Sequence, residues 1–192
     1  RVAYGYFPVG RDGNCLRVFD SNRENELGRF ELPRQRSGNR YCIADFFRDL
    51  DGDGRPSDVL PMQAVTMGEK ASEFAQRLFK GDHYSDYLYF HGLAVQMAEA
   101  LAEWVHARIR DELGFPDPET MPLRDVLAQR YRGSRYSFGY PACPNVADSR
   151  QQLDWLEANR IGLTMDASDQ LEPEQSTTAL VAIHSKARYF SA

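Results

Sequence analysis

The sequence has few cysteines, no long apolar run and no excess of positive charge. Its 192 residues include only three cysteines, Cys15, Cys42 and Cys143, which lie far apart. That number and spacing do not suggest a disulfide framework, and no Cys-x-x-Cys or His–Cys spacing predicts a zinc site. No apolar run reaches membrane-spanning length, and the N-terminus shows no signal-peptide pattern. We therefore expect a cytoplasmic protein with no membrane partner.

The charge balance and the missing motifs exclude further classes. A formal net charge of -5 and a pI near 5.4 argue against nucleic-acid binding, which favours a basic face. The sequence contains no GxGxxG, P-loop, GxSxG or HExxH motif. Hydrophobic residues make up 42% and charged residues 27%, as in ordinary globular proteins. The length predicts one sizeable domain, and because the chain begins abruptly with a strand pattern, we expect a piece of a larger polypeptide.

Strand patterns occur at both ends of the chain. Aromatic, β-branched or alternating segments predict strands at Val2–Pro8, Cys15–Phe19, Leu27–Leu32, Val59–Thr66, Ile161–Met165 and Thr178–Ile183. The turn residues of Gly10–Asn14 predict that the first two strands form a hairpin. The segment Tyr41–Phe47 is too short for its type to be assigned by periodicity.

Helical patterns fill the middle of the chain. Apolar spacing predicts helices at Glu69–Lys80, Tyr84–Leu113, Leu123–Arg132 and about Asp148–Asn159. In the third of these we expect Val126 and Leu127 to face inward. Without regular strand–helix alternation, the fold class is α+β: a single domain, 1–192, with a mostly antiparallel twisted sheet packed with helices, one of them long and central.

Two clusters of acidic side chains admit a functional and a structural interpretation. Asp49, Asp51 and Asp53 with Gly54 match the first half of a calcium loop, but Leu60 stands where that loop needs a glutamate, so a tight turn is favoured. In the long helix, Glu99, Glu103 and His106 lie along one side. A metal or acid–base role is possible there, and a solvated polar face is favoured.

The stretch Arg135–Pro144 (Arg-Tyr-Ser-Phe-Gly-Tyr-Pro-Ala-Cys-Pro) interrupts the helical patterns. Its two prolines remove N–H donors and favour extended backbone, so we expect a rigid loop. Arg135 offers a planar fork of donors for a carboxylate, and Tyr136, Phe138 and Tyr140 offer ring faces for a heterocycle or a cation. S-adenosylmethionine would use all of these groups. The alternative is a structural connection whose aromatic side chains fill the core.

Several segments together resemble the C-terminal activation domain of cobalamin-dependent methionine synthase. The resemblance covers nearly the whole chain and is strongest at Arg135 with Gly139–Pro144. Its further segments are Tyr4–Pro8, Asn39–Phe46, Ala98–His106 and Lys186–Phe190.

The resemblance implies a reactivation module. Such a domain binds S-adenosylmethionine and positions its methyl group for reductive methylation of cob(II)alamin, which restores methionine synthesis from homocysteine. The cobalamin is held by a neighbouring domain of the same enzyme, and flavodoxin or a flavoprotein reductase supplies the electron. The enzyme class is methyltransferase, although the isolated domain is not expected to turn over. The alternative is a non-catalytic docking module for a cobalamin domain or flavodoxin, without a ligand of its own.

The resemblance also carries residue roles. It implies that Arg135 binds the ligand carboxylate, that Ser137 and Gly139 contact the ligand through backbone groups, and that Tyr140 lies near the methyl group and the corrin as the catalytic residue. Glu99 matches a helix glutamate of the same pocket. No residue is assigned to a metal.

The chain departs from the family pattern in three places. Val181, followed by Ala182, stands where a tyrosine of the terminal strand often touches the ligand, so we expect only a backbone contact there. Asn145 replaces a common acid. We also expect that the family's upstream segment, with an aspartate that contacts the ligand, lies outside this sequence, so that the domain is truncated at its N-terminus relative to the family.

Overall fold

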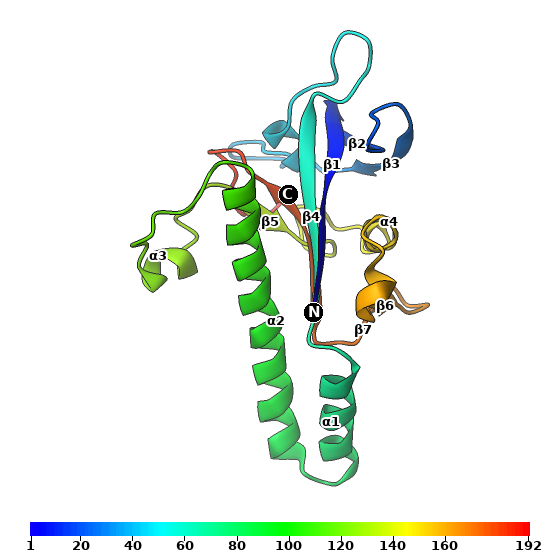
Figure 1. Ribbon diagram of the computed structural model, residues 1–192, viewed down its shortest axis with the longest axis vertical. Helices are drawn as coiled ribbons and strands as arrows, with labels where there is room; N and C mark the ends of the chain where they lie inside the picture. The colour runs from blue at the N-terminus through cyan, green and yellow to red at the C-terminus, as the bar shows by residue number, and fades with distance from the viewer.

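The computed structural model describes residues 1–192. Its main sheet contains the strands β1 (Val2–Asp12), β2 (Cys15–Phe19), β3 (Glu26–Glu31), β4 (Asp58–Thr66), β5 (Ser134–Tyr136) and β8 (Ser176–Ala182). Their order is β3-β2-β1-β4-β8-β5, and all neighbouring pairs are antiparallel. A separate two-stranded ribbon joins β6 (Thr164–Met165) and β7 (Leu171–Glu172). Helices flank the main sheet on both sides (Figure 1), which confirms the α+β class with a mostly antiparallel sheet.

The helical segments follow the predicted order. They are η1 (Ile43–Phe46), α1 (Glu69–Lys80), α2 (Tyr84–Glu112), α3 (Leu123–Leu127), α4 (Asp148–Trp155) and η2 (Ala158–Ile161), of which η1 and η2 are 3-10 helices. The long helix α2 and the shorter α1 pack against each other and extend beyond the end of the sheet (Figure 1). None of the helices combines the length and the apolarity needed to cross a bilayer.

The predicted hairpin is confirmed, but its first strand is longer than expected. β1 continues through Pro8 to Asp12, and the chain turns at Gly13, where φ is +62°. Pairing with β2 starts only at Val9, so Pro8, which has no N–H to donate, precedes that ladder. β3 and β4 each begin one residue before their predicted starts.

Other predicted elements have different bounds. α3 stops at Leu127 because Gln129 adopts a φ of +51°, and the prediction that Leu127 faces inward is wrong, since it is 76% exposed. α4 stops at Trp155, because Glu157 turns left-handed at a φ of +49°.

The segments near the C-terminus were predicted less well. The strand expected at Ile161–Met165 is reduced to β6, because its first residue closes η2. The last strand of the main sheet, β8, begins at Ser176, two residues earlier than predicted, and β7 lies in a segment expected to be loop.

Several of the large apolar side chains that predict α2 in the sequence are not buried. Leu88, Leu93, Met97 and Trp104 are 49–58% exposed. The face against the sheet instead carries Ala94, Ala98 and Ala102, followed by Val105 and Ile109, all nearly inaccessible. Small side chains allow the helix to approach β4 closely, and the buried Gln63 side chain of β4 donates to the Ala102 carbonyl at 3.1 Å. The helix was predicted correctly, but its apolar pattern does not identify its buried face.

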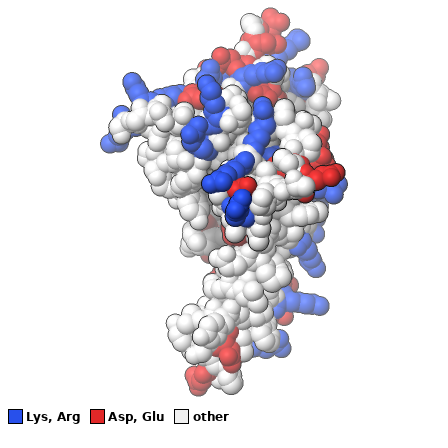
Figure 2. Space-filling view, turned by 90° about the vertical axis from the view of Figure 1, so that its left-hand side faces the viewer, with Lys and Arg blue, Asp and Glu red and all other residues white.

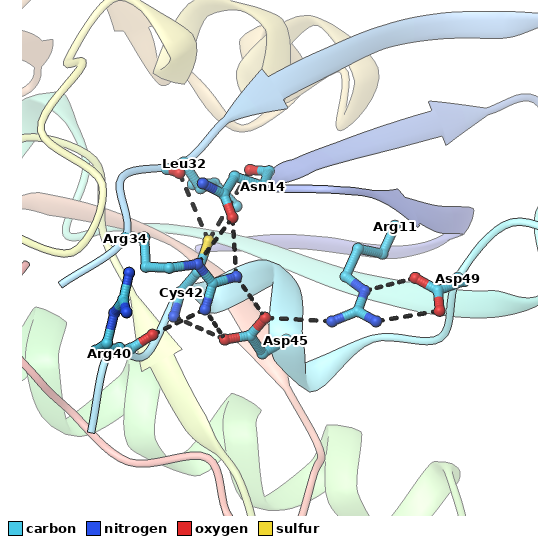
Figure 3. Close-up of polar contacts among 8 residues, drawn as sticks. All are labelled: Arg11, Asn14, Leu32, Arg34, Arg40, Cys42, Asp45 and Asp49. Carbon is cyan, nitrogen blue, oxygen red and sulfur yellow. Dashed lines mark hydrogen bonds and ion pairs between the residues drawn. The ribbon is translucent and has the colours of Figure 1, made fainter.

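A charged cluster fixes the segment that contains η1 (Figure 3). Asp45 accepts hydrogen bonds from the Arg34 guanidinium at 2.6 and 2.7 Å and from Arg11 of β1 at 3.2 Å. It also accepts from the Cys42 N–H at 3.0 Å. The bonds from Arg34 and from the Cys42 N–H hold the pKa of Asp45 below its usual value, against the opposing effect of burial. The cluster therefore connects this segment to β1 by charge-assisted bonds.

Candidate functional site

The Arg135–Pro144 segment begins as a strand at the edge of the main sheet. Arg135 lies in β5, where it pairs with Val181, and Tyr136 follows in the same strand. The expectation of a loop is therefore wrong for these first two residues. Membership of the sheet fixes the direction of the Arg135 side chain, because alternate strand residues point to opposite faces.

The rest of the segment folds into a turn closed by one cysteine. The Gly139 N–H donates to the Cys143 carbonyl at 2.9 Å, and the Cys143 N–H donates to the Tyr140 carbonyl at 2.9 Å. The Cys143 thiol donates to the Ser137 carbonyl at 3.0 Å, and burial raises its pKa to about 12. Gly139 has a φ of +92°, which favours glycine. The turn is thus held from within, with Gly139 exposed and Ser137 half-buried.

The three aromatic side chains of the segment are divided between core and surface. Tyr136 is 1% exposed and Phe138 is 8% exposed, and the Phe138 ring packs 5.0 Å from the ring of Phe30. Tyr140 is 57% exposed. The idea that all three rings could receive a ligand is therefore wrong for Tyr136 and Phe138, which fill the core as the structural alternative held. Only Tyr140 presents an accessible ring.

Arg135 is held by a glutamate on α2. Its Nη1 donates to Glu103 Oε2 at 2.8 Å, and this is the only hydrogen bond from its side chain to the protein. A guanidinium carries five N–H donors, so four remain without a protein partner. The Arg135 side chain is only 16% exposed. A partly buried arginine with unused donors is suited to a bidentate carboxylate.

Glu99 lies one helical turn before Glu103 on α2 and is exposed. It makes no hydrogen bond or ion pair within the chain, whereas Glu103 bonds both Arg135 and the Tyr131 hydroxyl, the latter at 2.9 Å. The structure thus brings Glu103 directly to Arg135 and leaves Glu99 free nearby on the same helix. Glu103 was absent from the predicted site. Its position four residues after Glu99 was the available signal, because such pairs share a helix face.

The interpretation of Glu99, Glu103 and His106 as one solvated polar face is wrong for two of the three. His106 is fully buried, and the Glu103 side chain is only 23% exposed. Burial lowers the pKa of His106 well below 6.5, and the nearby Arg110 and Arg135 lower it further. His106 is therefore neutral, with neither ring nitrogen hydrogen-bonded.

The side chain of Tyr131 contacts Arg110, His106 and Glu103. The Arg110 guanidinium lies over the Tyr131 ring, 3.9 Å from its centroid, and the His106 ring meets Tyr131 edge-on at 5.2 Å. Arg110 is itself fully buried and forms an ion pair with Asp117. Tyr131 is therefore enclosed between α2 and the following segment, and its hydroxyl is directed at Glu103.

Val181 and Ala182 offer no side chain to a ligand. Val181 is fully buried and packs with Val105 and Ile109 of α2. Ala182 is 1% exposed and lies in the main core. Contact through the backbone at these two positions stays a prediction.

The Asp49–Gly54 segment forms the tight turn that the sequence favoured. The Gly54 N–H donates to the Asp51 carbonyl at 3.0 Å, and the Asp51 carboxylate accepts the Asp53 N–H at 3.0 Å. The Asp49 carboxylate pairs with Arg11 at 2.6 Å. No group of three or more His, Cys, Asp or Glu side chains in the chain is arranged to hold a metal ion.

Four surface cavities of about 400 to 750 Å³ are lined by none of the predicted site residues. One of them, of about 550 Å³, lies between α1 and the β7–β8 connection, and no residue of the turn at Gly139 lines it. The candidate site is therefore defined by the donors and acids of β5, its turn and α2, and not by an enclosed cavity.

The chain is similar to known proteins over its whole length. The profile of the family described as "Vitamin B12 dependent methionine synthase, activation domain" matches residues 1–192. Two methionine synthases, from Mycobacterium tuberculosis and Mycobacterium leprae, are each 44% identical to the chain over 200 residues. The match covers 99% of this chain and 17% of each relative, so the chain spans about a sixth of their length.

A solved structure shares the fold. The crystal structure of the MetH reactivation domain bound to AdoHcy superposes with a TM-score of 0.87 at 25% sequence identity. The superposition covers 98% of this chain and 59% of that one.

Proposed function

We propose a function from one established premise: the chain belongs to the family of vitamin B12 dependent methionine synthase activation domains. In this proposal it is a reactivation module that binds S-adenosylmethionine. In this role it directs the ligand's methyl group to a cobalamin held by another domain of the same methyltransferase. The related reactivation domain was crystallised with S-adenosylhomocysteine, which is S-adenosylmethionine without the transferred methyl group.

The observation that carries the proposal is that Arg135 is largely buried and yet has unused hydrogen-bond donors. Its side chain is 16% exposed, and its guanidinium uses one of its five N–H groups within the chain. The ligand's carboxylate would accept from the remaining donors, and its ammonium group would meet the exposed Glu99 of α2. Backbone groups of Ser137 and Gly139, and those of Val181 and Ala182, complete the proposed set of contacts.

The reaction divides between this chain and its partners. The cobalamin, when bound, supplies the cobalt that takes the methyl group from the sulfonium sulfur, with one electron from a donor protein, and S-adenosylhomocysteine is left. The chain contributes binding and orientation. The exposed ring of Tyr140 is assigned to the side of the site that faces the methyl group and the corrin.

The electron donor is proposed to be flavodoxin or a flavoprotein reductase. Figure 2 shows Lys and Arg side chains on the upper part of one face, with Asp and Glu side chains between and beside them. Charged groups of both signs on such a face can orient a protein partner. Three unpaired, buried cysteines are consistent with the reducing cytoplasm, in which we place the enzyme.

A second candidate function is a docking module for the cobalamin domain or flavodoxin that needs no ligand of its own. The observation that favours it is the exposed apolar stripe of α2 formed by Leu93, Met97 and Trp104, which share one helix face. Under this function, Leu93→Glu would abolish association with the cobalamin-binding domain, and no ligand would bind at Arg135.

Calorimetric titration with S-adenosylmethionine and S-adenosylhomocysteine separates the two functions. The reactivation module is expected to bind both ligands with a stoichiometry of one. Saturable association with the cobalamin domain in the absence of any ligand heat would instead support the docking module.

A further inference from the structure

We propose that Glu103 is a positioning residue for Arg135: it holds the guanidinium at the edge of the sheet and leaves the remaining N–H groups free for the ligand's carboxylate. The inference rests on the proposed function. Glu103 itself needs no contact with the ligand, which distinguishes it from Glu99.

Glu103 binds its neighbours through a single oxygen. Oε2 accepts both the Arg135 Nη1–H at 2.8 Å and the Tyr131 hydroxyl at 2.9 Å. The other oxygen, Oε1, is buried and has no hydrogen-bond partner. The carboxylate is thus held by two donors from different parts of the chain, and this sets where Arg135 can lie.

Tyr131 is in turn supported on both sides. The Arg110 guanidinium lies 3.9 Å from the centroid of its ring, and His106 meets the ring at 5.2 Å. Arg110 is fixed by Asp117. Glu103 cannot change its rotamer without losing the Tyr131 hydroxyl bond, because that ring is packed in place.

The charges in this cluster leave Arg135 only one anionic partner. Arg110 pairs with Asp117, and His106 is buried and without a hydrogen-bond partner, so it provides no negative charge. Without Glu103, Arg135 would have no ion pair within the chain and could rotate toward solvent. Ligand binding would then have to order the side chain again, which costs affinity.

The same ion pair could in principle compete with the ligand for Arg135. The geometry favours positioning, because only one of the five donors is used and a bidentate carboxylate needs two of the other four. The two roles predict opposite effects. Removing a positioning charge weakens binding, whereas removing a competing charge strengthens it.

The test compares two ligands in calorimetric titrations of the protein. S-adenosylhomocysteine has the amino-acid head group, and 5′-methylthioadenosine lacks it. Glu103→Gln is expected to weaken S-adenosylhomocysteine binding about tenfold and to leave 5′-methylthioadenosine binding unchanged. Tyr131→Phe is expected to weaken S-adenosylhomocysteine binding about threefold and to leave 5′-methylthioadenosine binding unchanged. This variant tests the inference if Glu103→Gln fails to fold. Asp111→Asn, which removes an exposed charge from the same helix, should change neither affinity.

The outcomes separate this inference from the proposed function. Unchanged or tighter S-adenosylhomocysteine binding by Glu103→Gln would overturn positioning, as would equal losses for both ligands, which indicate a general structural defect. In an Arg135→Ala background, Glu103→Gln should cause no further loss of affinity. Failure of the unsubstituted protein to bind S-adenosylhomocysteine would overturn the proposed function, and this inference with it.

Discussion

Arg135 of β5 lies directly opposite Val181 of β8, and both side chains reach the same helix. Val181 packs on Val105 and Ile109 of α2, whereas Arg135 pairs with Glu103, two residues before Val105. The apolar contact fixes the helix on the sheet, and this places the glutamate beside the arginine. The candidate site therefore depends on the packing of α2 as much as on the turn that follows Arg135.

Arg135→Ala is expected to weaken S-adenosylmethionine binding more than tenfold, a loss of about 1.4 kcal/mol or more. The substitution removes every donor proposed for the ligand's carboxylate and leaves Glu103 without its cation. Isothermal titration calorimetry measures the change. Arg130→Ala is the matched control, because that arginine is 70% exposed and lies on the α3 side of the chain. Equal affinities for the Arg135 variant and the unsubstituted protein would contradict the assignment.

Gly139→Ala is expected to destabilise the fold by about 1 to 2 kcal/mol, because an alanine at a φ of +92° is strained. Its Cβ would also meet Val146 Cγ2 at 3.1 Å. Urea unfolding measures the loss. Gly52→Ala serves as the control, because no atom lies within 4 Å of a Cβ built there and its φ is not left-handed. Similar free energies of unfolding for both variants would show that the turn at Gly139 tolerates side chains.

The buried His106 is expected to make the protein less stable as the pH falls. Its pKa in the folded state is well below 6.5, the value expected when the chain is unfolded. Below about pH 6.5 the unfolded state therefore binds more protons, so the stabilising contribution is complete above that pH and is lost on acidification.

The slope of unfolding free energy against pH measures this effect. One titrating proton changes the free energy of unfolding by at most about 1.4 kcal/mol per pH unit. His106→Gln should reduce the slope between pH 7 and pH 5. An unchanged slope would mean that His106 is not the group responsible.

Asp45→Asn is expected to lower the free energy of unfolding by about 1 to 3 kcal/mol, because it leaves the guanidinium groups of Arg34 and Arg11 without their shared carboxylate. The pKa of Asp45 is lowered from 3.8, so its contribution is present above that pH and is lost as the pH falls through the lower folded-state value. Asp53→Asn is the control, since its side chain is exposed and forms no ion pair. Chemical denaturation at pH 7 tests the difference, and equal midpoints for the two variants would exclude a stabilising role.

Local sequence features determined most of the elements. Apolar periodicity predicted α1 and α2 nearly to the residue, and turn residues predicted the β1–β2 hairpin, because these signals depend on neighbours along the chain. The hydrogen-bond donors of Arg135 and the turn at Gly139 also followed from residue type. The Arg-x-x-x-Gly-Tyr-Pro-Ala-Cys-Pro run was specific enough to indicate the family.

Only the tertiary structure decided which side chains meet. The face of α2 that contacts the sheet carries Ala94, Ala98 and Ala102 with Val105 and Ile109, whereas Leu93, Met97 and Trp104 remain exposed, a division that the hydrophobic pattern does not reveal. The pairing of β5 with β8 placed Tyr136 in the core, and the turn that follows β5 placed Phe138 in the core and Tyr140 at the surface. The meeting of Glu103 with Arg135 depends on two segments 32 residues apart being packed together. Such contacts arise when a helix packs on a sheet. This packing joins segments that are distant along the chain, so no single stretch of sequence contains the information.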